Sequence, residues 1–219
     1  MASAADRVFV FLHLKAAGSG WQRLAGALAT TVAAIPDCSL VGTFMGLFGI
    51  GNHEVFALLA APSADAGAEA RIRSGLPVDI EVCAAMTMRA TARPATDAPL
   101  QREGLYVFRF FDVRDGDVDE VVRLSCTAWE TFESPAGLPS TGYTSEPMAL
   151  FRPSRQNDAP VHDADARGRM LLLTWYDNFT SWERSRTPAP EAAENFRRRA
   201  ELTSRTIAYA TRAVTGGAA

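Results

Sequence analysis

The chain has 219 residues, of which 47% are hydrophobic and 21% charged, with a formal net charge of −3. This composition is typical of a chain that buries a core, and it excludes collagen-like, coiled-coil and disordered classes. Basic residues form no cluster beyond Arg197–Arg199, so we expect no nucleic-acid partner. No apolar run approaches the roughly 18 residues of a membrane span, and the first residues lack a signal peptide, so we expect no membrane partner and a cytoplasmic location.

The first part of the chain predicts the order strand, helix, strand, strand, helix, strand. Apolar runs rich in β-branched and aromatic residues predict strands at 7–15, 39–45, 54–60 and 79–91. Helical spacing predicts helices from 19 to 36 and from 63 to 73, and prolines lie at or beyond their ends.

The segment 93–103 has two prolines and no periodicity, which is typical of a linker. The order of elements then repeats. We predict strands at 105–113, 148–152, 169–176 and 205–214, and helices at 118–132 and 181–200, the second interrupted near Pro188 and Pro190.

Two copies of a βαββαβ unit predict an α+β fold of two tandem ferredoxin-like repeats, residues 6–92 and 104–216, joined by the linker. The strands are apolar on both faces, so the second face of each sheet needs a cover. We therefore expect the two sheets to face each other as one eight-stranded barrel with helices outside and a small pocket inside. Such a chain closes the barrel alone, which leaves monomer and homodimer open.

The second repeat resembles the NIPSNAP family at two stretches. Tyr106, Arg109 and Gly116 match the family's opening strand and helix, and Tyr176 and Asp177 match its later strand end. The resemblance covers about residues 104–215; in the first repeat, Leu12 stands in the place of Arg109. It implies the dimeric α/β barrel superfamily, which includes cofactor-free monooxygenases, isomerases and lyases, haem enzymes, and members without established activity.

Arg109 and Tyr176 are the first candidates for catalytic residues. On period-two alternation Arg109 shares a face with Phe111, and Tyr176 shares one with Thr174; we assign both faces to the barrel interior. A guanidinium binds carboxylate, enolate or carbonyl oxygens, and a phenol beside it can act as a hydrogen-bond donor or general acid. The alternatives are a structural ion pair for Arg109 and a core-edge position for Tyr176.

His53 is the best candidate for a base, because the repeat alignment places it on the pocket side with Val55 and Ala57. His13 alternates onto the helix side of its strand, although a slip of one residue would turn it inward. The further substrate-binding candidates are Phe111, Thr174, Trp129, Tyr143 and His13. His162 lies in a polar segment without ligand spacing, and the three cysteines have no CxxC pattern, so no metal site is predicted.

The leading hypothesis is a cofactor-independent isomerase, lyase or monooxygenase that acts on a small hydrophobic metabolite bearing oxygen. Arg109 and Tyr176 would stabilise an enolate-like oxygen, and His53 would move the proton. The alternatives are a non-catalytic ligand-binding or protein-interaction protein, and a haem-binding barrel in which His53 or His13 faces a large apolar cavity.

Overall fold

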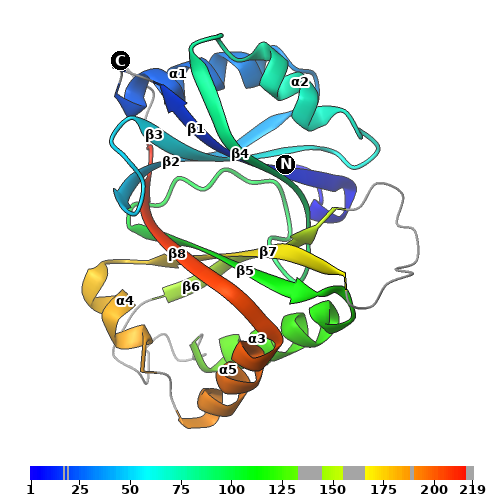
Figure 1. Cartoon of the computed structure of the whole chain (residues 1–219), viewed down its shortest axis with the longest axis vertical. Helices are drawn as coiled ribbons and strands as arrows, with labels where there is room; N and C mark the ends of the chain where they lie inside the picture. The colour runs from blue at the N-terminus through cyan, green and yellow to red at the C-terminus, as the bar shows by residue number, and fades with distance from the viewer. Residues whose placement is uncertain (17, 19, 133–144, 155–165, 188–189, 216–219) are drawn as a thin grey trace.

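The computed structural model describes residues 1–16, 18, 20–132, 145–154, 166–187 and 190–215. Eight strands close into one barrel in the order β1-β3-β2-β8-β5-β7-β6-β4, and helices cover it on two opposite sides (Figure 1). Among the described residues, no helix is long and apolar enough to cross a membrane.

The first unit contains four strands and two helices in the predicted order. Its elements are β1 (Arg7–Ala16), α1 (Trp21–Ala33), β2 (Ser39–Phe48), β3 (Glu54–Pro62), α2 (Ala68–Gly75) and β4 (Ile80–Ala90), preceded by the 3-10 turn η1 (Ala4–Asp6).

The second unit repeats this order and divides its last helical region in two. Its elements are β5 (Leu105–Arg114), the 3-10 turn η2 (Asp115–Asp117), α3 (Val118–Phe132), β6 (Ser145–Pro153), β7 (Arg167–Tyr176), α4 (Phe179–Ser185), α5 (Pro190–Leu202) and β8 (Thr203–Ala213). Pro190 is the first residue of α5, where its missing N–H has no helical partner to lose.

The two units join along two antiparallel seams. At one seam β2 pairs with β8, and at the other β4 pairs with β6 through only three residue pairs. Because each sheet pairs with the other at both of its edges, the eight strands form a closed barrel, although each seam is paired over only a few residues. A single chain therefore completes the architecture.

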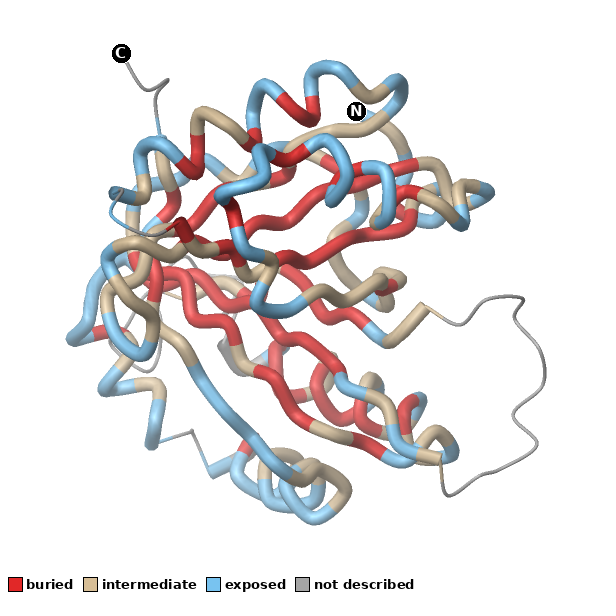
Figure 2. Tube along the Cα trace, turned by 45° about the horizontal axis from the view of Figure 1, so that its top comes forward, coloured by how far each residue is buried: buried red, intermediate tan, exposed pale blue. Residues whose placement is uncertain are grey.

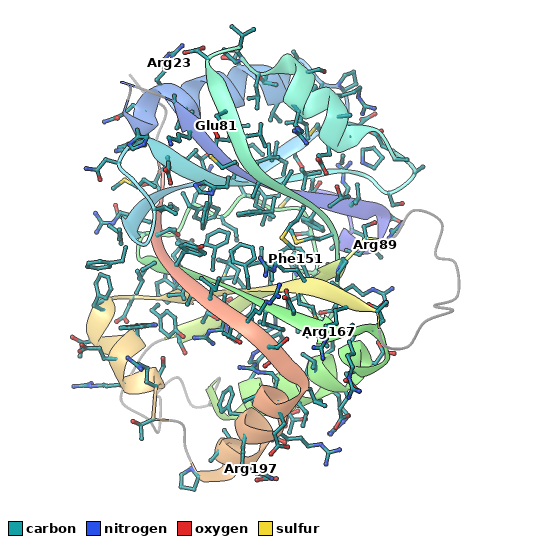
Figure 3. The ribbon with its side chains drawn as sticks, in the orientation of Figure 1. Arg23, Glu81, Arg89, Phe151, Arg167 and Arg197 are labelled. Atoms are coloured by element: carbon teal, nitrogen blue, oxygen red, sulfur yellow. The ribbon has the colours of Figure 1, made fainter. Side chains whose placement is uncertain are left out.

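Aromatic rings fill the space between the two sheets. Phe11 of β1, Phe56 of β3 and Phe108 of β5 contact one another with ring centroids 5.0–6.0 Å apart. Phe151, labelled in Figure 3, lies in the same core. Burial raises the pKa of Tyr106 in this core to about 12. Buried aromatic side chains therefore occupy this part of the barrel interior.

The outer face of each sheet packs against helices of its own unit. Leu12 and Val10 of β1 are buried against α1 and α2, and Phe111 and Val113 of β5 are buried against α3. Figure 2 shows these buried strands as two layers between the more exposed helices. Each unit therefore has a second core between its sheet and its helices.

The linker is tied to the first unit by one buried carboxylate. Asp97 is 4% exposed and accepts hydrogen bonds from the Ala2 N–H at 2.7 Å, Arg7 Nε at 2.9 Å and Ser39 Oγ at 3.2 Å. Arg7 Nη2 also lies 2.9 Å from Asp97 Oδ2. The linker thus fastens the starts of β1 and β2.

Candidate functional site

Arg109 lies on the helix side of β5, opposite to the face that we predicted. Phe108 and Phe110 belong to the barrel core, so the alternating Arg109 and Phe111 face α3 and α5. On β7, Leu173 and Trp175 point into the barrel, while Thr174 and Tyr176 point toward the helices. The prediction failed because both faces of these strands are apolar, and alternation alone does not say which face is inner.

His13 and His53 also lie in other places than we predicted. His13, expected on the helix side, lies at the barrel-core side of β1, with Nε2 2.9 Å from Glu54 Oε2 and its ring 5.0 Å from the Phe56 ring. His53 lies before β3 with 44% of its side chain exposed, and Val55 and Ala57 face the helices. Neither histidine is brought to Arg109 or Tyr176.

A small cavity lies between β5, β7 and the helices of the second unit. Its volume is about 30 Å³ and its lining residues are Arg109, Trp129, Pro147, Leu172, Thr174, Tyr176, Phe196 and Arg199. We call it the helix-side cavity. Four of the predicted site residues thus meet here. Phe111 is buried nearby without lining the cavity, and Tyr143 lies outside the described residues.

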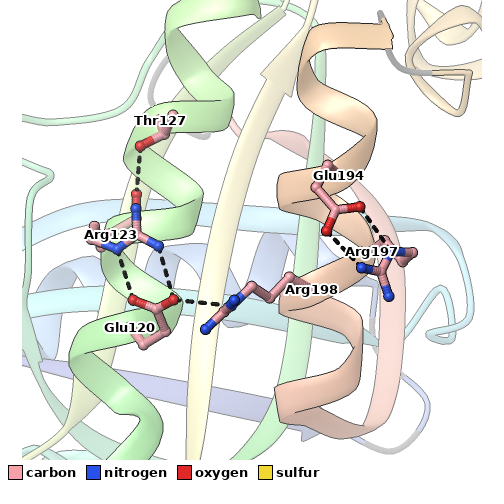
Figure 4. Close-up of polar contacts among 6 residues, drawn as sticks. All are labelled: Glu120, Arg123, Thr127, Glu194, Arg197 and Arg198. Carbon is pink, nitrogen blue, oxygen red and sulfur yellow. Dashed lines mark hydrogen bonds and ion pairs between the residues drawn. The ribbon is translucent and has the colours of Figure 1, made fainter.

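Arg199 is positioned by the pairing of α5 with α3. Of three consecutive arginines, Arg197 pairs with Glu194 on its own helix, and Arg198 Nε reaches Glu120 Oε1 of α3 at 3.2 Å (Figure 4). Arg199 turns inward, donates from Nη1 to Ser125 Oγ at 3.2 Å and lies over the Phe196 ring. The Arg198–Glu120 pair joins the outer sides of α5 and α3, and Arg199 lies on the inner side of α5 at the cavity.

Among the described residues, the cavity lining has two guanidinium groups and no carboxylate. Arg109 has no hydrogen bond or ion pair with any described residue, and Arg199 has only the neutral Ser125 as its hydrogen-bond partner. Burial, together with the nearby charge of Arg109, lowers the pKa of Arg199 to about 10. Both groups are positive near neutral pH, so the site favours an anion.

The phenol of Tyr176 completes the polar lining. Its Oη lies 3.3 Å from Ser185 Oγ, and that serine donates its single proton to the Trp182 carbonyl at 2.7 Å. The phenol hydroxyl is therefore the donor of this pair and can turn to a ligand. Thr174, 9% exposed, adds a second hydroxyl to the lining.

Sequence reasoning missed Arg199, which it noted only as part of the basic run Arg197–Arg199. The spacing of Ala192, Phe196 and Arg199, four and then three residues apart, puts all three on one helix face. Since Ala192 is buried, this periodicity is the signal that would have found the inward arginine.

The described cavities offer haem no His, Cys or Tyr ligand at porphyrin size. Protein ligands of haem iron are His, Cys, Met or Tyr, and Tyr176 lines only the 30 Å³ cavity, far below the size of a porphyrin. A cavity of about 680 Å³ between the linker and β6 is lined by Met148 but by no described His, Cys or Tyr. No three His, Cys, Asp or Glu side chains gather as a metal site in the described part of the chain.

No family model and no curated protein matches the sequence. Solved structures do match over nearly the whole chain. A candidate chlorite dismutase has a TM-score of 0.60 at 10% identity, covering 96% of each chain. An anthrone oxidase-like protein has a TM-score of 0.57 at 14% identity, covering 97% of this chain and 94% of that one. A candidate monooxygenase from Lactobacillus acidophilus NCFM has a TM-score of 0.51 at 11% identity, covering 94% and 93%.

These similarities define the class of fold. The protein is a dimeric α/β barrel built from two ferredoxin-like units in one chain, and the predicted fold class is confirmed. At identities of 10–14% the matches show the fold alone, so the chemistry has to be argued from the helix-side cavity.

Proposed function

We propose that this protein is a cofactor-independent enzyme of the monooxygenase, isomerase or lyase type whose substrate carries an ionised or ionisable oxygen. The observation that carries the proposal is the pair of guanidinium groups, Arg109 and Arg199, which share one cavity whose described lining contains no carboxylate. The similarity to proteins described as a monooxygenase and as anthrone oxidase-like supports the same class, and so does the NIPSNAP-like pattern around Arg109 and Tyr176.

The cavity is suited to the oxygen end of such a substrate. A volume of about 30 Å³ holds an oxygen-bearing head group but not a whole metabolite. The two guanidinium groups would stabilise the negative charge that develops on the oxygen when the substrate loses a proton. The resulting enolate-type ion has an electron pair on carbon, from which isomerisation, elimination or reaction with dioxygen as co-substrate can start.

Tyr176 is the one titratable group in the lining besides the two arginines. We assign it the hydrogen bond that its phenol donates to the substrate oxygen. The proton that the substrate loses passes to solvent, because the described lining offers neither imidazole nor carboxylate as a base. Thr174 would orient the same head group.

One observation favours a second candidate function, which is ligand binding without catalysis. The lining of the helix-side cavity contains neither imidazole nor carboxylate, the side chains that most often act as general bases. The ligand in this case is still an anion of the same kind, and turnover distinguishes the two candidates.

The test is a screen of small enolisable ketones, phenols and carboxylic acids, read by calorimetry for binding and by NMR and oxygen uptake for turnover, with a metal chelator present. We expect Arg109→Gln and Arg199→Gln each to weaken binding about tenfold or more. The matched control Arg197→Gln lies two residues from Arg199, faces outward and should behave as wild type. Unchanged binding in both cavity variants would contradict the proposal, and binding without turnover would select the second candidate.

A further inference from the structure

A separate group of arginines lies near the end of β5 and the starts of β7 and β8. A cleft of about 470 Å³ is lined by Asp112, Arg167, Gly168, Arg169, Ser204 and Arg205. We call it the arginine cleft; Figure 3 labels Arg167. It shares no lining residue with the helix-side cavity. Its side chains come from three paired strands, which hold their spacing more rigidly than a loop would.

The cleft has more positive than negative charge. Arg169 donates from Nε and Nη2 to the two carboxylate oxygens of Asp112, at 2.8 and 3.4 Å. Arg205 Nε lies 4.0 Å from Asp112 Oδ2, and Arg167 Nη1 donates only to Ser204 Oγ at 3.2 Å. Among the described lining residues, one carboxylate thus serves three guanidinium groups, which leaves an excess of two positive charges.

The backbone of Arg205 adds an independent observation. Its φ is 49°, a left-handed conformation that side-chain-bearing residues adopt at a cost in free energy. The conformation falls where the pairing of β5 with β8 shifts register between Phe110 and Asp112. This bulge brings the third guanidinium to Asp112, although glycine would suit the backbone better. Strained positions of this kind cluster at ligand-binding sites.

We propose that the arginine cleft binds the dianionic phosphate group of a small molecule. Guanidinium groups bind phosphate oxygens in pairs of hydrogen bonds, and Arg167 and Arg205 have donors that Asp112 does not use. A phosphate monoester carries a charge between about −1.5 and −2 near neutral pH, which matches the excess in the lining. A single carboxylate group would leave half of that excess uncompensated.

The experiment is isothermal titration of the full chain with inorganic phosphate, glycerol 3-phosphate and malonate, at constant ionic strength set with chloride. We expect phosphate and its ester to bind wild type and the outward-facing control Arg197→Gln equally. Arg167→Gln and Arg205→Gly should each bind phosphate about tenfold more weakly. Tighter binding of the ester than of inorganic phosphate would identify an organic phosphate as the ligand. Malonate binding as tight as phosphate, or no phosphate binding to wild type, would overturn the proposal.

Arg205→Gly also separates ligand binding from a structural role. Glycine relieves the left-handed backbone, so the free energy of unfolding should not fall although phosphate affinity does. Asp37→Gly relieves a similar conformation, φ 58°, outside the lining of the arginine cleft and should leave phosphate affinity unchanged. Arg109→Gln should also leave it unchanged; if that variant loses the phosphate, the anion binds in the helix-side cavity and this proposal is wrong.

Discussion

Asp97 stabilises the folded state through several contacts, although it lies in a segment that the sequence predicts only as a linker. Burial by itself raises the pKa of its carboxyl group, but the Ala2 N–H, the charge of Arg7 and the hydrogen bonds from Arg7 and Ser39 together hold that pKa below its usual value. The carboxylate therefore stabilises the folded state only while it is ionised.

We predict that Asp97→Ala lowers the free energy of unfolding by about 3 kcal/mol, because it leaves a partly buried guanidinium without its partner. The folded-state pKa lies below the unfolded one, so this stabilisation is present above the ordinary pKa of an aspartate and is lost as the pH falls through the lower, folded-state value. Urea unfolding of both proteins across the acidic range measures it. The exposed Asp6→Ala is the control, and a constant difference between Asp97→Ala and wild type at all pH values would contradict the argument.

Three residues of the site show what the sequence could predict and what it could not. Arg109 and Tyr176 were found because a charged and a phenolic group stand out in apolar strands. Their face was misassigned, since it depends on which side the second sheet covers. Arg199 escaped because its neighbours are charged, and only the helical spacing to Phe196 distinguishes it.

At the scale of elements, the sequence predicted every strand and the helical regions in order, because apolar runs and proline positions act locally. It did not predict how the linker meets β5. Gly104, with φ 139°, directly precedes that strand, and a Cβ there would lie 2.3 Å from Trp175 Nε1 and 2.5 Å from the Tyr176 carbonyl oxygen.

Gly104→Ala should therefore destabilise the protein by about 2 kcal/mol or more, since both the φ angle and the contacts oppose a side chain. Gly26 in α1 is the control for which we expect the opposite sign of the stability change, because a Cβ there meets no atom within 4 Å. Gly26→Ala should stabilise the protein by about 0.5–1 kcal/mol through helix propensity. Thermal unfolding of the two variants decides, and shifts of the same sign would refute this explanation.

At the scale of the whole molecule, the aromatic core makes the two units one folding unit. Phe108 of the second unit is fully buried, and its ring centroid lies 4.9 Å from that of Phe44 and 5.2 Å from that of Phe56, both in the first unit. A change at this position removes contacts from both sheets at once.

We predict that Phe108→Ala lowers the free energy of unfolding by about 3–5 kcal/mol. Native-state hydrogen exchange should show the same loss of protection in β1 and β3 as in β5 and β7, because the units unfold together. The control Phe48→Ala, at a ring that is 64% exposed, should change protection little. Loss of protection confined to β5–β8 would show instead that the units unfold separately.

The presence of both units in one chain also sets the stoichiometry of the helix-side cavity. In a barrel assembled from two identical chains, any substitution enters both sheets, and two equivalent sites can influence each other. Here the position that corresponds to Arg109 in the first unit is Leu12, which is fully buried among aliphatic side chains. One molecule then offers one such cavity, and its ligand should saturate it along a simple hyperbola with a single equivalent per chain.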